Sequence, residues 1–362
     1  MTRYDSHFPV PIAKKTRVLF FEPTPGHSYL FDLYGRLPEA QFVGKQGFFW
    51  TNPSDFLRSF LDYSEKHLRS HVRVIVFMTL DMFLHVDAFP MVNSWLQQKQ
   101  QRIYGFLHEV PEEPAVWERL RILSQRIQII VLSEEMKALL EKGGIASVLW
   151  LPHHAVHFQY ERESAAVLRD LYGIPQDAFV ATFLGELRKG KGIELILDCL
   201  KGLQNKNVIL NFAGKATDYL PSDIRDRLQE NGISARLNVS RNADPAEYRV
   251  MSDRQYVREL LISDALLLPY IGRQGRVMSG VLPDAVHFGV PVLCTRESII
   301  GTIVEKYGLG RTFSERDSFG LAIELNRMME SRNRFVGSQK AYASLIDPQK
   351  VLKMLTSILN AA

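Results

Sequence analysis

Cysteine is nearly absent from this 362-residue chain, which contains only Cys199 and Cys294, each inside an apolar run. Two such cysteines cannot build a disulfide framework, so we expect a reducing compartment such as the cytoplasm. The first residues, MTRYDSHFPVPIAKKTR, lack the apolar stretch of a secretory signal. No apolar run approaches the roughly 20 residues that a membrane-spanning helix needs. We therefore expect a cytoplasmic protein without a spanning helix.

The net charge of the chain is also small. The chain has 44 Lys and Arg against 40 Asp and Glu, a net charge of +4. This balance is too weak to indicate a nucleic-acid partner, and the chain has no zinc-finger spacing. It fits an anionic substrate or peripheral contact with the inner face of the plasma membrane. Hydrophobic residues make up 46% of the chain, which is typical of a globular protein with substantial cores, and the length suits two domains.

Short apolar runs alternate with amphipathic helical stretches, a pattern typical of parallel sheets covered by helices. The runs predict strands at residues 17–21, 72–77, 102–107, 127–132, 147–154, 179–184, 208–213, 236–239, 265–269 and 290–294. A charged helical stretch after residue 160 separates the two series. We expect an α/β protein with two Rossmann-like domains, 1–160 and 161–345. A C-terminal helix within 346–362 could pack back on the first domain.

Local signals place several helix ends and turns. Ser133 followed by two glutamates predicts a capped helix start, and residues 252–255 read as a capping box. We expect His153 and His154, beside the predicted domain boundary, to hydrogen-bond to backbone groups.

The most informative stretch is FLGELRKGKGIELILDCL, residues 183–200. An apolar strand ends at Gly185, a basic loop follows, and an amphipathic helix starts near Gly192. Backbone amides at the head of a helix attract anions, and Arg188, Lys189 and Lys191 lie beside them in the sequence. This arrangement predicts an anion site.

A second turn of the same kind is Ser279-Gly280-Val281. Gly280 permits close backbone approach, and Ser279 can cap the helix that follows. Two phosphate-binding turns in one α/β domain indicate a pyrophosphate held from both sides, as in a nucleotide sugar.

Four motifs then appear in one order. They are Gly185 with Lys191 and Gly192, the segment AGK at 213–215, ISDALLLPY at 262–270, and SGVLPDAVHFGVPVLCT at 279–295. In this order they resemble the donor domain of the GT-B glycosyltransferases, in particular the retaining family 4 enzymes (glycosyl transferases group 1). The resemblance covers about residues 125–325, and the first hundred residues match in layout only. It implies two Rossmann-like domains facing each other across a cleft, with the acceptor on the first and the donor on the second.

The resemblance assigns roles to the two turns. Lys191 matches the lysine that neutralises the leaving phosphate. The family's arginine position holds Glu186, and Arg188, two residues on, could substitute for it. The amides of 279–281 would seat the distal phosphate.

The family's Glu-x7-Glu pair is altered here. Asp284 stands where the second glutamate reaches the ribose hydroxyls, and a carboxylate can accept from them. Arg276 stands where the first glutamate contacts the transferred sugar. Either Arg276 points away and a backbone amide replaces it, or it faces an acidic group such as a uronic acid carboxylate or an acceptor phosphate.

The first half offers fewer candidates. By the resemblance, His108 ends a strand near the transferred sugar, and Glu109 is a second polar contact. Gly26 and His27 fall where the family places an acceptor-side loop.

The resemblance implies a retaining hexosyltransferase in which the departing phosphate oxygen takes the acceptor proton. Asp-x-Asp is absent, so we expect no metal and no cofactor. The donor would be a UDP- or GDP-sugar, and the acceptor a glycan, a lipid-linked molecule or a small molecule in bacterial polysaccharide or glycoconjugate biosynthesis. Two alternatives stay open. Glu186 and Arg276 would suit a catalytically silent GT-B binding partner, and a sugar-nucleotide 2-epimerase shares the fold.

Overall fold

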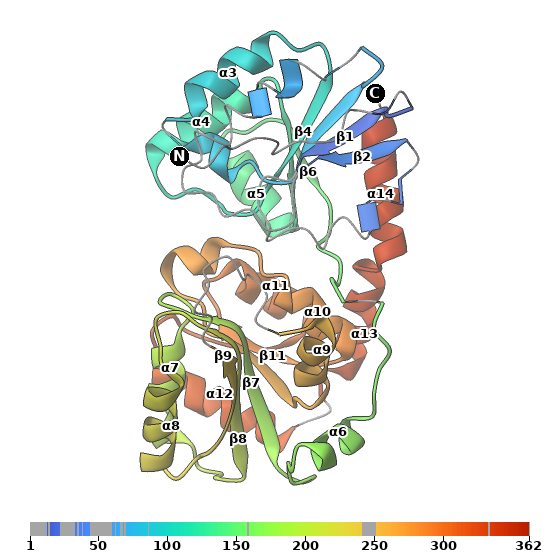
Figure 1. The fold of residues 1–362 in the computed structure, drawn as a ribbon. Helices are drawn as coiled ribbons and strands as arrows, with labels where there is room; N and C mark the ends of the chain where they lie inside the picture. The colour runs from blue at the N-terminus through green and yellow to red at the C-terminus, as the bar shows by residue number, and fades with distance from the viewer. Residues whose placement is uncertain are drawn as a thin grey trace, which may run out of the picture. The chain divides into compact units, whose positions relative to one another are not determined.

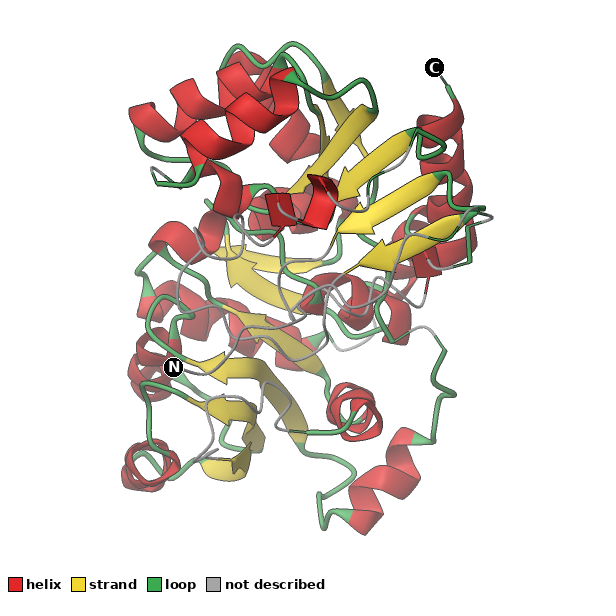
Figure 2. Ribbon diagram, turned by 45° about the horizontal axis from the view of Figure 1, so that its top comes forward, coloured by secondary structure: helices red, strands yellow, loops and turns green. Residues whose placement is uncertain are grey.

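The computed structural model describes residues 13, 15–21, 33–34, 36–37, 39–43, 60–61, 63–65, 68, 70–85, 87–157, 159–240, 251–331 and 334–361. Gly26 and His27 lie outside these described residues. The chain divides into two compact units (Figure 1). Unit 1 comprises Met1–His153 with Pro348–Ala362, and unit 2 comprises His154–Asp347. Strands and helices alternate along each unit (Figure 2).

Unit 1 is built on a six-stranded parallel sheet in the order β2-β1-β3-β4-β5-β6. Its strands are β1 (Val18–Phe21), β2 (Ala40–Val43), β3 (Val74–Phe77), β4 (Arg102–Leu107), β5 (Gln128–Val131) and β6 (Val148–Trp150). Its helices include η2 (Asp81–Leu84), α3 (Phe89–Gln97), α4 (Pro114–Ser124), α5 (Glu134–Lys142) and α14 (Pro348–Asn360).

The two faces of this sheet are covered by different helices. Trp95 of α3 packs against Phe77 of β3, with ring centroids 6.0 Å apart. Tyr104 of β4 donates its hydroxyl to the carbonyl of Ile358 in α14. Phe77 pairs with Gly105, so Phe77 and Tyr104 point to opposite faces. Helix α14 therefore covers the face away from α3, as Figure 1 also shows.

Unit 2 has a second six-stranded parallel sheet, in the order β12-β11-β10-β7-β8-β9. Its strands are β7 (Phe179–Leu187), β8 (Val208–Ala216), β9 (Ser234–Ser240), β10 (Ala265–Leu268), β11 (Val292–Thr295) and β12 (Gly310–Phe313). Its helices are α6 (Ala165–Leu171), α7 (Ile193–Asp198), η3 (Cys199–Gly202), α8 (Pro221–Glu230), α9 (Asp253–Leu261), η4 (Gly272–Arg276), α10 (Val281–Phe288), α11 (Ile299–Tyr307), α12 (Ser318–Glu330) and α13 (Val336–Leu345).

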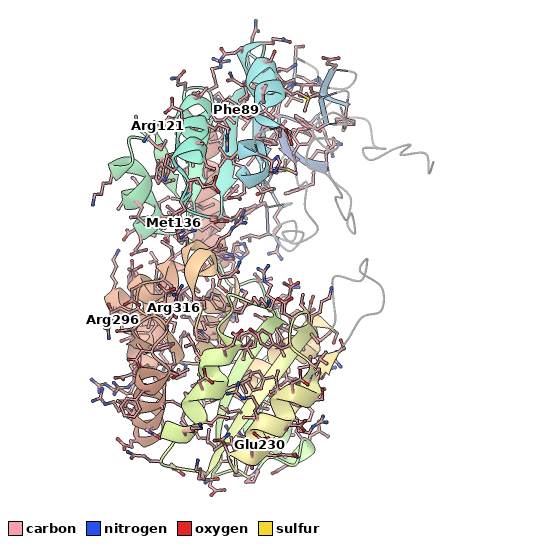
Figure 3. All side chains as sticks on the ribbon, turned by 90° about the vertical axis from the view of Figure 1, so that its left-hand side faces the viewer. Phe89, Arg121, Met136, Glu230, Arg296 and Arg316 are labelled. Carbon is pink, nitrogen blue, oxygen red and sulfur yellow. The ribbon has the colours of Figure 1, made fainter. Side chains whose placement is uncertain are left out.

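Aromatic side chains fill much of the core of unit 1. Phe21 and Phe60 meet edge to face with centroids 4.5 Å apart, and Phe77 and Phe83 do so at 4.6 Å. Such pairs contribute about 0.5–1.5 kcal/mol each beyond their buried area. Both cysteines of the chain are unpaired and buried in unit 2. Figure 3 labels three charged residues that are exposed, Arg121, Glu230 and Arg296.

The expected strands and caps are largely confirmed. Ser133 accepts from Met136 N and begins α5, and Ser252 forms the expected capping box with Gln255 at the start of α9. Two strands were not predicted, β2 and β12. Both lie at sheet edges and are only partly buried, so their sequences (AQFV and GRTF) carry little apolar periodicity.

The predicted end of β7 at Gly185 is wrong. Strand β7 continues to Leu187, β8 continues to Ala216, and Glu186 pairs with Lys215. Gly185 and Gly214 are partners with φ of +136° and +140°, and a Cβ on Gly214 would lie 1.9 Å from the carbonyl oxygen of Gly185. These glycines therefore permit a close approach inside the sheet rather than ending it.

Candidate anion-binding site at the carboxyl edge of the second sheet

The loop that follows β7 is hydrogen-bonded to the segment that follows β10. Arg188 donates from Nη2 to Oε1 of Gln274 at 2.9 Å, and the amide of Ile271 donates to the carbonyl of Gly190 at 2.9 Å. Two stretches far apart in the sequence therefore form one structure at the carboxyl edge of the sheet. This edge is where open α/β sheets bind ligands.

Lys191 is the central cation of this loop. Its ammonium lies 3.8 Å from the centroid of the Tyr270 ring, within the range of a cation–π contact. The side chain is half-buried, and among the described residues it has no carboxylate partner. The neighbouring Lys189 is exposed, and its backbone amide donates to Asp218 at 2.7 Å. Lys191 thus has a fixed position and a positive charge that no ion pair with a described residue neutralises.

Arg188 is partly neutralised by Glu186, which stands where the resemblance to the family 4 enzymes would place an arginine. Its Nε lies 3.3 Å from Oε2 of Glu186, and the two side chains are 39% and 38% exposed. At that exposure an ion pair contributes at most about 1 kcal/mol, so a competing anion could displace Glu186.

Gly192 allows the loop to turn directly into α7. Its φ is +76°, and a Cβ there would lie 2.0 Å from the carbonyl oxygen of Pro269. Only glycine meets both conditions without moving the backbone. The expected helix start near Gly192 is confirmed, since α7 begins at the next residue.

The second turn lies at the head of α10. Ser279 is buried, and its Oγ accepts from the amide of Val281 at 3.3 Å. Gly280 is the N-cap residue of α10, and as a glycine it has no side chain to accept a capping hydrogen bond. Arg276 is half-buried at the end of η4. Amide groups at this helix head, together with Lys191, supply the kinds of donors that bind phosphate.

Asp284 lies in the first turn of α10, and its side chain is 1% exposed. Oδ1 accepts from the amides of Val156 and His157 at 2.7 and 3.0 Å, and Oδ2 accepts from Nδ1 of His157 at 2.8 Å. The carboxylate therefore fixes the segment at the start of unit 2 to α10. Contact between Asp284 and a ribose hydroxyl stays a prediction.

In unit 1, His108 is buried and held by β3 and η2. Its Nε2–H donates to the carbonyl of Met78 at 2.7 Å, and its amide donates to Oδ2 of Asp81 at 3.4 Å. Glu109 is half-exposed beside it. The role of both in contacting a sugar stays a prediction. His154 has the backbone partner expected for it, the carbonyl of Ala155 at 2.8 Å from Nδ1.

Two groups at the site were not singled out from the sequence. Tyr270 and Gln274 position Lys191 and Arg188, yet each is ordinary in type. The sequence feature that could have identified Tyr270 is its place two residues after the apolar strand β10 ends at Leu268. Within the described residues, no group of three His, Cys, Asp or Glu side chains could hold a metal ion, and no helix is long and apolar enough to cross a membrane.

Comparison with known proteins shows the fold. No protein-family model and no curated protein sequence matches this chain. Among solved structures, HepE of Anabaena in complex with UDP is 14% identical, with a TM-score of 0.71 over 96% of this chain and 100% of that one. Sucrose-phosphate synthase of Thermosynechococcus elongatus is 13% identical, with a TM-score of 0.70 over 94% and 98% of the two chains.

WaaG, a glycosyltransferase involved in lipopolysaccharide biosynthesis, is a third similar structure. It is 14% identical, with a TM-score of 0.66 over 95% of this chain and all of that one. The two six-stranded parallel sheets flanked by helices are those of GT-B glycosyltransferase structures, so the predicted fold class is confirmed.

Proposed function

We propose that the protein is a glycosyltransferase that binds a nucleotide-diphosphate sugar in unit 2. The observation that carries this proposal is the position of Lys191. Its ammonium is unpaired among the described residues and is held over Tyr270. The loop that bears it is tied to the 270–274 segment, which leads into the helix head at 279–281.

In this proposal the protein supplies fixed charges and dipoles. Lys191 and Arg188 neutralise the leaving diphosphate, and the amides of 279–281 seat the distal phosphate. Transfer proceeds with retention and without a metal. The departing phosphate oxygen takes the acceptor proton, so the protein positions the reactants and needs no strong base. Gly185, Glu186, Asp284 and Arg276 complete the donor-binding set.

His108 of unit 1 would contact the transferred sugar as a catalytic residue. The acceptor belongs to unit 1, with Glu109, Gly26 and His27 as its contacts. The donor base is proposed as uracil, because HepE has been solved with UDP and with UDP-glucose. The acceptor is proposed as a glycan or lipid-linked molecule in polysaccharide assembly. Two observations support this acceptor. WaaG is involved in lipopolysaccharide biosynthesis, and this chain has a small positive net charge of +4. The enzyme would act in the cytoplasm or at the inner face of the membrane.

A second candidate is a GT-B protein that binds a nucleotide without turnover. The ion pair of Arg188 with Glu186 favours it, because that contact lowers the positive charge available to a diphosphate. Arg276 in place of an acidic residue favours it too, and the same replacement speaks against a 2-epimerase.

The first test is thermal unfolding of the protein with a panel of nucleotides and nucleotide sugars in EDTA. A ligand that binds only the folded state raises stability by RT ln(1 + [L]/Kd). We expect an upward shift with UDP species, and release of free UDP when an acceptor is added. No shift with any nucleotide would reject a donor site in unit 2. Binding with no sugar release across glycan, lipid-linked and small acceptors would favour the silent protein.

A further inference from the structure

A second basic site lies in unit 1, at the amino-terminal edge of its sheet. A cavity of about 670 Å³ opens between the start of β4 and the start of β5. Its cations are Lys99, Arg102 and Arg126, and none of its described lining residues is acidic. Its volume lies within the roughly 300–1,000 Å³ of small-molecule sites.

Within the described part of unit 1, none of these cations is neutralised by an ion pair. Among the described residues, no carboxylate pairs with Lys99, Arg102 or Arg126. Nη1 of Arg102 is buried without any hydrogen-bond partner. A guanidinium N–H shielded from water without an acceptor costs free energy, and three nearby like charges repel one another. An anion in the cavity would relieve both penalties.

Two of the cations are held in place, Arg126 by backbone carbonyls and Lys99 by an aromatic ring. Arg126 donates from Nη2 to the carbonyls of Leu96 and Lys99, at 3.3 and 2.6 Å, which ties the end of α3 to the start of β5. Nζ of Lys99 lies 5.1 Å from the centroid of the Trp95 ring. These contacts fix the positions of Arg126 and Lys99 before any ligand binds.

The sheet register adds neutral polar groups. Tyr104 pairs with Gln128, and Arg102 lies two residues before Tyr104, so all three point to one face. Gln100 and Gln101 also line the cavity. Amide groups both donate and accept, which suits the hydroxyl groups of a saccharide.

We propose that this cavity binds a phosphorylated saccharide, with the phosphate on Arg102, Arg126 and Lys99 and the hydroxyls on the glutamine amides. The site is built entirely from unit 1 and is separate from the donor site of unit 2. The phosphate chemistry has two sources, a free sugar phosphate or the phosphate headgroup of a membrane lipid.

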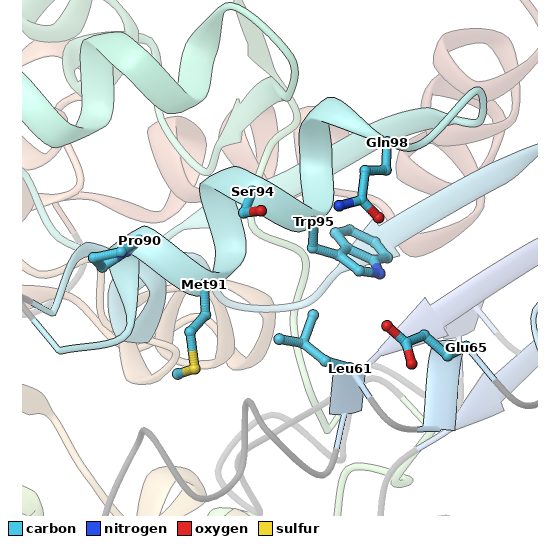
Figure 4. Close-up of a pocket in the computed structure, with 7 residues that line it drawn as sticks. All are labelled: Leu61, Glu65, Pro90, Met91, Ser94, Trp95 and Gln98. Carbon is cyan, nitrogen blue, oxygen red and sulfur yellow. The ribbon is translucent and has the colours of Figure 1, made fainter.

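A neighbouring pocket in unit 1 shows the contrast (Figure 4). It has a volume of about 420 Å³ and is lined by Met91 and Trp95 of α3 and by the carboxylate of Glu65. None of its described lining residues is a cation. It therefore lacks the charge that marks the Arg102 cavity as an anion site.

The test measures binding of glucose 6-phosphate to the full chain by isothermal titration calorimetry. Gln128→Glu adds a carboxylate at an exposed position in the cavity, and Gln125→Glu adds the same charge at an exposed position outside its lining. We expect binding to weaken about tenfold or more in Q128E and to change less than about twofold in Q125E. Arg102→Gln should weaken it similarly; if that variant unfolds, Q128E decides.

Lys191→Ala is the control that separates this site from the donor site, and it should leave glucose 6-phosphate binding intact. Vesicles of phosphatidylcholine with and without phosphatidic acid form the second arm. Binding only to phosphatidic acid vesicles, with the same loss in Q128E, would uphold the phosphate site, assign its source to lipid and overturn the saccharide contacts of the glutamine amides. Binding to neither probe, or binding that Q128E leaves unchanged, would overturn the proposal.

Discussion

Nδ1 of His157 lies 2.8 Å from Oδ2 of Asp284, which joins the segment at the start of unit 2 to the first turn of α10. The other ring nitrogen of His157 lies 3.6 Å from Asp253, and the ring stacks on Tyr256 with centroids 4.3 Å apart. Asp284 is thus held among groups of its own unit, close to the turn proposed to seat a phosphate.

Removing the Asp284 carboxylate should destabilise unit 2. Asp284→Ala leaves the amides of Val156 and His157 without their acceptor, at about 1–3 kcal/mol for each group that water cannot reach. Asp284→Asn keeps one acceptor oxygen and should cost less. Urea unfolding measures both. Asp253→Asn is the control and should have the smallest effect, because Asp253 is 27% exposed and its distance from His157 is longer. An unchanged urea midpoint for Asp284→Ala would contradict this assignment.

Two glycines in the loop after β7 should respond differently to alanine. Gly192→Ala places a Cβ 2.0 Å from the carbonyl oxygen of Pro269, at a φ of +76°. Gly190→Ala has a similar φ of +83°, but its nearest contact is the flexible side chain of Gln274 at 3.0 Å. The positive φ alone costs about 1–2 kcal/mol in each. Backbone overlap adds about 1–3 kcal/mol in Gly192→Ala only. Thermal unfolding of both variants checks the difference, and equal losses would count against it.

A buried polar network supports β9. Glu259 is 1% exposed and accepts from Asn211 at 2.8 Å and from Asn238 at 2.7 Å, and it also pairs with Arg236. Glu259→Ala leaves these donors without an acceptor, and we expect a loss of about 3–5 kcal/mol in the free energy of unfolding.

The control for the Glu259 network is an exposed ion pair. Asp198 pairs with Arg227 at 2.7 Å, and their side chains are 53% and 45% exposed. Asp198→Asn should cost no more than about 1 kcal/mol. Comparable losses for the two variants in urea unfolding would show that burial does not govern the contribution of Glu259.

Stability should fall as the pH drops below about 6.5, because burial lowers the pKa of His154 from 6.5. At such a pH His154 binds a proton in the unfolded chain and stays neutral in the folded protein. The stability is therefore fully present above the pKa that His154 has in the unfolded chain, and it is lost as the pH falls below that value. Burial also lowers the pKa of His287. Urea unfolding of His154→Gln between pH 5 and 7, a window chosen around the ordinary histidine pKa of about 6.5, should show a shallower pH dependence than the parent chain.

Glu163 is the control for that window. Hydrogen bonding to Arg258 lowers the pKa of Glu163 to about 2, so its contribution is lost only as the pH falls below its unfolded value of 4.5. Glu163→Gln should therefore leave the dependence between pH 5 and 7 unchanged. A parent-like slope in His154→Gln would show that His154 is not the source.

The features that the sequence predicted are local. Ser133 and Ser252 each cap a helix through a residue three positions further along the chain, so the local sequence alone identifies both caps. The apolar runs also located the central strands. The GT-B layout followed because several motifs kept their order along the second half.

The features that were missed depend on contacts between distant residues. Gly185 looked like a strand end because neither its φ nor its approach to Gly214 is visible in the sequence. The partner of Asp284 lies in another segment, at His157, and the ring beneath Lys191 comes from Tyr270. Residue type indicated the chemistry of the site, and only the tertiary structure supplied the partners.

The most direct test of the account compares two neighbouring lysines. UDP is titrated into the parent chain, Lys191→Ala and Lys189→Ala in EDTA, with affinity read by calorimetry. We predict that Lys191→Ala weakens UDP binding about tenfold or more, because a charge-assisted contact is lost, while Lys189→Ala stays within about twofold. Equal affinities in the two variants, or no binding of UDP to the parent chain, would contradict a donor site built around Lys191.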